Sequence, residues 1–163
     1  MSQNTSTASL FRKLIPSIIT TGLVAGTMDG LAAIINFSIN GGKNPEIIFK
    51  YIASGAIGEN AFSGGTGSTL LGVMFHYLIT FCWTILFFWV YPKIKGLAEN
   101  KLLAALQYGI FVWVVMNLFV VPISQISKET INISKGRIEL LILILCIGLP
   151  ISLMANKHYL YKK

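Results

Sequence analysis

Two ionisable residues inside long apolar runs are the strongest candidates for chemistry in this sequence of 163 residues. Asp29 carries the one charge of the apolar run 14–39, and His76 lies within the run 68–91. A carboxyl group in the middle of a membrane costs about 2.5–3.5 kcal/mol on insertion scales, so it must face protein or water. Asp29 therefore predicts either an ion, proton or polar-substrate site or a structural hydrogen bond. His76 is either a ligand or a hydrogen-bonded core residue.

Polar or small residues occupy every fourth position of the second run, namely Ser68, Gly72, His76, Thr80 and Thr84. This spacing places them on one face of a helix, and we expect that face to turn towards protein rather than lipid. Asn117 is strongly polar and lies in the middle of the run 102–123. We expect Asp29, His76 and Asn117 to meet in one intramembrane polar cluster, with Glu59 at its edge.

Glycines predict a close helix contact. Gly22, Gly26 and Gly30 follow one another at four-residue spacing in the first run, and Gly72 lies on the polar face of the second. Such a row forms a groove where another helix backbone can approach closely. The row is interpreted either as helix packing or as a surface that binds partner helices.

The sequence lacks the motifs of the common catalytic and cofactor sites. It has no phosphate-binding GxxxxGK[ST] loop, no HExxH zinc motif and no GxSxG nucleophile elbow. Cys82 and Cys146 each lie in an apolar run and are interpreted as small hydrophobic residues. We therefore expect no catalytic residue, no metal ion and no cofactor, and the sequence does not favour an enzyme.

The composition explains what must position these residues. Hydrophobic residues make up 54% and charged residues 12% of the chain, whereas soluble domains average about 25% charged residues. The mean hydropathy is +0.69, and a soluble domain this short could not bury so much apolar surface. This excludes most soluble enzymes and nucleic-acid binders. The net charge of +7 is interpreted as the bias that orients membrane helices.

The pattern predicts an all-α membrane protein, a bundle of four transmembrane helices plus one short interfacial or re-entrant helix. The spans are expected at 14–39, 68–91, 102–123 and 138–155, since about 20 apolar residues cross a bilayer. Pro150 is expected to kink the last of them. Residues 1–13 are expected to form a flexible cytoplasmic tail and residues 156–163 a basic cytoplasmic tail.

The segment 45–62 is too short and too polar to span comfortably. Asn44, Pro45 and Glu46 have the residue types of a helix start. The segment is expected either to lie in the headgroup plane as an amphipathic helix or to dip in as a re-entrant helix.

Basic residues favour one orientation. Eight lie on one side of a four-span topology, namely Arg12, Lys13, Lys93, Lys95, Lys101, Lys157, Lys162 and Lys163. Five lie on the other, namely Lys43, Lys50, Lys128, Lys135 and Arg137. This excess predicts that both termini are cytoplasmic.

Several short motifs resemble the small bacterial inner-membrane proteins of the YagU-like type. They are the GLVAG run 22–26, the later His76, the YPKIK junction 91–95, and Met116 followed by the VPI exit 121–123. The resemblance implies a multi-pass protein of the bacterial inner membrane and supplies no reaction.

Two functions from different classes remain open. The first is a small transport or permeation protein that uses Asp29 and His76 in a polar path. The second is a non-catalytic scaffold or accessory subunit that binds partner helices through the glycine face. The expected partners are the lipid bilayer and either further copies of the chain or a partner membrane subunit, and no nucleic acid.

Overall fold

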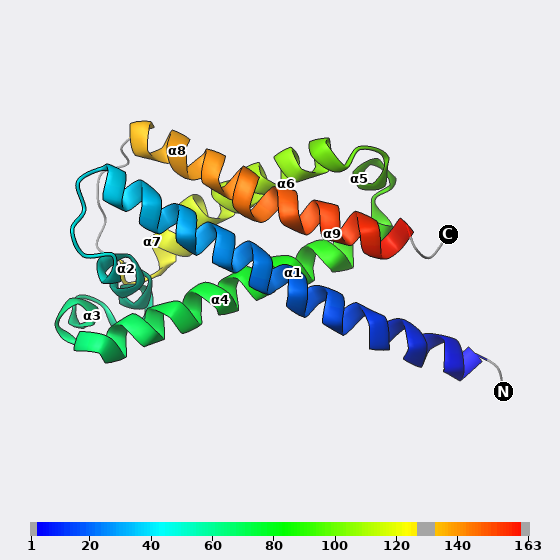
Figure 1. The fold of residues 1–163 in the computed structure, drawn as a ribbon, viewed down its shortest axis with the longest axis horizontal. Coiled ribbons are helices and arrows are strands. Elements are labelled where there is room, and N and C mark those ends of the chain that lie inside the picture. The colour runs from blue at the N-terminus through cyan, green and yellow to red at the C-terminus, as the bar shows by residue number, and fades with distance from the viewer. Residues whose placement is uncertain (1–2, 127–132, 161–163) are drawn as a thin grey trace.

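The computed structural model describes residues 3–126 and 133–160, whose regular structure is helical without a strand. Four helical rods form the bundle in Figure 1. The rods are α1 (Gln3–Ile39), α4 (Gly65–Val90), α6 (Lys101–Val115) with η2 (Met116–Val120) and α7 (Val121–Ile123), and α8 (Ile133–Leu143) with η3 (Ile144–Gly148) and α9 (Leu149–Leu160).

Each rod contains a stretch long and apolar enough to cross a bilayer. These stretches are Leu14–Ile39, Gly65–Lys93, Lys101–Ile123 and Gly136–Tyr159. They agree with the four predicted spans to within four residues at each end. The prediction of an all-α bundle of four membrane-spanning helices is confirmed.

The two ends of the chain lie at the same end of the bundle as α5 (Lys95–Glu99), as four antiparallel spans require (Figure 1). The two terminal segments expected to be tails lie partly within helices. α1 already begins at Gln3, because residues 3–13 contain neither glycine nor proline to stop a helix that the apolar run propagates. The segment 156–163 begins inside α9, which ends at Leu160, and residues 161–163 lie outside the described residues.

The segment 45–62 forms α2 (Glu46–Ile57) and α3 (Asn60–Ser63) at the opposite end of the bundle. Figure 1 shows α2 almost end-on while the four rods lie along the page, so α2 crosses the bundle and packs against α4. The Asn44 side chain accepts a hydrogen bond of 3.1 Å from the Glu46 N–H and starts α2. Gly58 ends it with a positive φ of 62°, a conformation that glycine adopts without strain.

The cluster of buried hydrophobic residues lies mainly in the half of the bundle nearest the termini. The ring centroids of Phe87 and Tyr108 are 4.5 Å apart. The Tyr108 hydroxyl donates to the Trp83 carbonyl at 2.5 Å, and the Tyr159 hydroxyl donates to the Phe88 carbonyl at 2.7 Å. These bonds fasten α6 and α9 to α4 at this end.

The glycines named above lie at helix contacts within the chain. A Cβ at Gly22 would collide with the Phe81 ring, and a Cβ at Gly26 would lie 2.9 Å from the Tyr77 ring. The row on α1 is therefore covered by α4. Gly72 faces the backbone of Phe49 in α2, which leaves no room for a Cβ.

Two π-helical turns widen the third and fourth rods. η2 and η3 each end two residues before a proline, Pro122 and Pro150. A proline lacks the N–H of the helical ladder, and its ring displaces the carbonyl four residues earlier. Those carbonyls belong to Leu118 and Cys146, which lie inside the two π turns. The interruption expected at Pro150 thus takes the form of a wide turn.

Candidate functional site

A cavity of about 380 Å³ lies between α1, α2, α4 and the two rods that carry the π turns. Trp83, Val112 and Ile147 line it on the side of the dense core, and Tyr51 and Ala56 of α2 line it on the other. Most of its wall is apolar and a few polar groups converge on it. Volume and lining are those of a small-molecule binding site.

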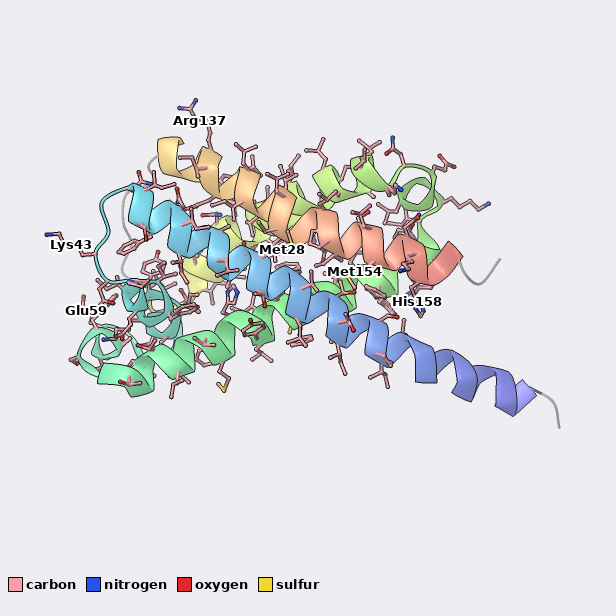
Figure 2. All side chains as sticks on the ribbon, viewed as in Figure 1. Met28, Lys43, Glu59, Arg137, Met154 and His158 are labelled. Atoms are coloured by element: carbon pink, nitrogen blue, oxygen red, sulfur yellow. The ribbon has the colours of Figure 1, made fainter. Side chains whose placement is uncertain are left out.

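Asp29 and His76 both line this cavity, from α1 and α4. Each lies about 15 Å from the end of its helix that adjoins α2, at about 1.5 Å per residue. The hydrocarbon core of a bilayer is about 30 Å thick. The two side chains therefore lie near half depth, and in Figure 2 the neighbouring Met28 marks this position midway along the rods.

The Asp29 carboxylate faces the cavity without a hydrogen bond from any residue that the structure describes. Asp29 interacts electrostatically with His76. A buried carboxylate in a purely structural role normally accepts hydrogen bonds from the protein. The oxygens of Asp29 are thus available to water or to a ligand.

The nitrogen atom through which the His76 imidazole donates a hydrogen bond can be assigned. Its Nε2 atom lies 2.8 Å from the carbonyl oxygen of Gly26. A carbonyl only accepts, so the hydrogen must be on Nε2, and in the neutral ring Nδ1 is then an acceptor. No hydrogen bond joins Nδ1 to another described residue.

Two hydroxyl groups of the wall also donate hydrogen bonds to backbone carbonyls. Thr80 donates to the carbonyl of His76 at 2.9 Å, and Ser124 donates to the carbonyl of Val121 at 2.7 Å. Their oxygens retain lone pairs that can accept from a ligand. Among the residues that the structure describes, no lysine or arginine lines the cavity. The oxygens of Asp29, Thr80 and Ser124 therefore supply this wall with hydrogen-bond acceptors.

The other two residues of the expected polar cluster lie elsewhere. The amide of Asn117 donates to the carbonyl of Trp113 on its own helix at 3.0 Å, and the neighbouring Met116 lines the cavity instead. Glu59 lies at the outer end of the bundle beside α3 (Figure 2). The structure therefore brings together Asp29 and His76, and places Asn117 and Glu59 outside the cavity wall.

Most of the lining residues were not selected from the sequence, among them Tyr51, Trp83 and Ser124. Ser124 follows α7, and the segment after it is tied to α2 because Gln125 donates to the carbonyls of Gly55 and Ala56, each at 3.1 Å. This tertiary contact holds the segment of Ser124 against α2, beside the cavity. Trp83 could have been found, since it lies one helical turn beyond Ile79 and Thr80 on α4.

Within the described ranges, no three His, Cys, Asp or Glu side chains lie close enough to hold a metal ion. The chain matches no protein-family model, no curated protein and no solved structure.

Proposed function

We propose that this multi-pass membrane protein is a small transport or permeation protein, with Asp29 and His76 as its intramembrane polar site. The observation that supports the proposal is the cavity of about 380 Å³ that both side chains line near half depth. Transporters commonly bind their substrates near the bilayer midplane, beside interrupted helices. The π turns η2 and η3 change the helical hydrogen bonding without breaking the rods, and Met116 and Ile147 from them line the cavity.

The energetic cost of Asp29 supports a functional role. A carboxyl at mid-membrane destabilises insertion by about 2.5–3.5 kcal/mol. A structural Asp would offset this by accepting hydrogen bonds from neighbouring helices. Asp29 accepts none from the described residues and faces a cavity instead. The carboxylate is placed as a ligand-binding group would be.

The scaffold alternative has less support. Its docking surface was the glycine row of α1, and in this chain α4 covers that row through Phe81, Tyr77 and His76. The outer surface carries exposed apolar side chains such as Leu31 and Leu70. This surface is suited to lipid contact.

The proposal includes the bacterial inner membrane with both termini in the cytoplasm. The YagU-like motifs and the excess of basic residues at the terminal end support it. This orientation puts α2, Lys43 and Arg137 on the periplasmic side; Figure 2 shows both residues at the end of the bundle opposite the termini.

Uptake into proteoliposomes tests this function. Purified protein is reconstituted and offered potassium ions, 2-phenylethylammonium, 2-phenylethanol, phenylacetate and glucose in separate assays. We expect at least one solute to enter faster than in protein-free liposomes and the Asp29→Asn variant to lose this uptake. Asn is close to Asp in size, so it retains polarity and removes the charge.

A matched control is Glu99→Gln, which removes an exposed carboxylate in α5 far from the cavity. It should transport like the wild type. Uptake of no solute, or equal uptake by the Asp29→Asn protein at equal reconstituted amounts, would refute the proposed function.

A further inference from the structure

We propose that the cavity binds a small organic cation, whose ammonium group pairs with Asp29 while its apolar body lies against the wall. This inference rests on the proposed function and names the substrate class of the same site. It follows from three properties of the wall: the sign of its charge, the hydrogen-bonding capacity of its polar atoms, and the nature of its apolar surface.

The charge and the hydrogen bonds favour a donor with positive charge. The ionised Asp29 carboxylate can only accept, and in the neutral form of His76 the Nδ1 atom also accepts, because Nε2 donates to Gly26. The hydroxyl oxygens of Thr80 and Ser124 also accept, since their hydrogens are bonded to backbone carbonyls. An ammonium group has three donors and no acceptor. In the described part of the wall, an anion would meet the Asp29 carboxylate and no lysine or arginine.

The apolar wall selects an organic rather than an inorganic cation. The rings of Tyr51, Phe75 and Trp83 line the cavity together with aliphatic side chains. Aromatic faces attract ammonium groups, and tryptophan does so best. A bare metal ion would need several oxygen ligands, whereas Asp29 is the one carboxylate that the described residues contribute to this wall. The volume of about 380 Å³ leaves room for an alkyl or aryl group attached to the ammonium.

Three probes of nearly the same shape separate charge from size. They are 2-phenylethylammonium, which is a cation, 2-phenylethanol, which is neutral, and phenylacetate, which is an anion. Binding to the purified full-length protein in mild detergent is measured by calorimetry at neutral pH. We expect the cation to bind at least about tenfold more tightly than the alcohol, since a hydrogen bond to a charged group contributes that much or more. Phenylacetate should bind most weakly.

Variants connect this preference to Asp29. Asp29→Asn should weaken binding of the cation by about tenfold or more and leave binding of the alcohol within about twofold. Asp29→Glu keeps the charge and should keep the preference for the cation, which makes the test independent of any loss of folding in Asp29→Asn. Glu99→Gln should bind all three probes like the wild type.

Equal affinity for the cation and the alcohol in the wild type would overturn the inference, and so would unchanged binding of the cation by a folded Asp29→Asn protein. If phenylacetate or the alcohol is transported in an Asp29-dependent way and the cation is not bound, the substrate class is wrong and the proposed function remains. If the cation binds through Asp29 and no solute is transported, the cation site is correct and the transport function is wrong.

Discussion

His76 and Gly26 are joined by a hydrogen bond of 2.8 Å from Nε2 to the carbonyl oxygen, which links α4 to α1 about one turn from Asp29. A Cβ at Gly30 would lie 3.3 Å from the same Nε2 atom. The two glycines therefore let the imidazole lie directly against the backbone of α1. The glycine row of α1 therefore allows close helix packing and also leaves room for His76 beside Asp29.

The hydrogen bond between His76 and Gly26 can be tested by substitution. His76→Gln keeps an N–H that can reach the carbonyl, whereas His76→Leu removes the donor. We expect the Leu variant to be less stable than the Gln variant by about 0.5–1.5 kcal/mol, the net contribution of one hydrogen bond. Thermal unfolding in detergent measures this difference. A Leu variant as stable as the Gln variant would show that the bond does not hold α4 to α1.

Gly72 and Gly67 lie on the same helix and differ in what a side chain would meet. A Cβ at Gly72 would overlap the backbone carbonyl of Phe49, which cannot rotate away, whereas nothing lies within 4 Å of a Cβ at Gly67. We expect Gly72→Ala to destabilise the protein by about 1–3 kcal/mol through overpacking. Gly67→Ala should be neutral or stabilising by up to about 1 kcal/mol, because alanine favours helix. Thermal unfolding of the two variants compares them, and equal stabilities would contradict the contact between α2 and α4.

Asn117 and Glu59 provide a test of which polar residues belong to the site. Neither lines the cavity, since Asn117 bonds to the Trp113 carbonyl and Glu59 directly precedes α3 at the outer end of the bundle. We expect Asn117→Leu and Glu59→Gln to keep uptake of the transported solute within about twofold of the wild type. The loss of one buried polar contact with the solute would reduce uptake by more than this. If either variant lost as much uptake as Asp29→Asn at equal amounts of folded protein, the substituted residue would belong to the site.

The sequence alone was sufficient to predict the four spans and the face of α4 that is buried. Their length and hydropathy leave little choice in a bilayer, and Ser68, Thr80 and Thr84 are buried as the four-residue spacing predicted. Both predictions depend only on the residues of a single helix.

The composition of the site could not be predicted in the same way. Asn117 lies within the π turn η2, where the α-helical period of 3.6 residues no longer predicts which side chain faces inward. Met116 and Val120 of the same turn line the cavity instead. Tyr51 and Ser124 reach the cavity because α2 crosses the bundle and Gln125 binds it. These are tertiary contacts between segments far apart in the chain, and no local pattern encodes them.

The orientation predicted from basic residues has its own test. A reporter active only in the periplasm, inserted after Lys43 between α1 and α2, should be active. The same reporter fused after the last residue should be inactive, since the excess of lysine and arginine retains that side in the cytoplasm. Reporter activity in cells, corrected for the amount of fusion protein, decides between the two orientations. The reverse pattern would invert the topology.

The most direct test of the central claim, that Asp29 opens into a cavity in the middle of the bundle, is the reaction of a cysteine at this position with a small water-soluble thiol reagent. Cys82 and Cys146 are first replaced by alanine, and Asp29→Cys is compared with Leu23→Cys, whose side chain is 48% exposed on the outer, apolar surface of α1. We predict that Asp29→Cys in membranes reacts at least about tenfold faster, because a thiolate forms and reacts only where water reaches it. A reaction no faster than that of Leu23→Cys would contradict the account.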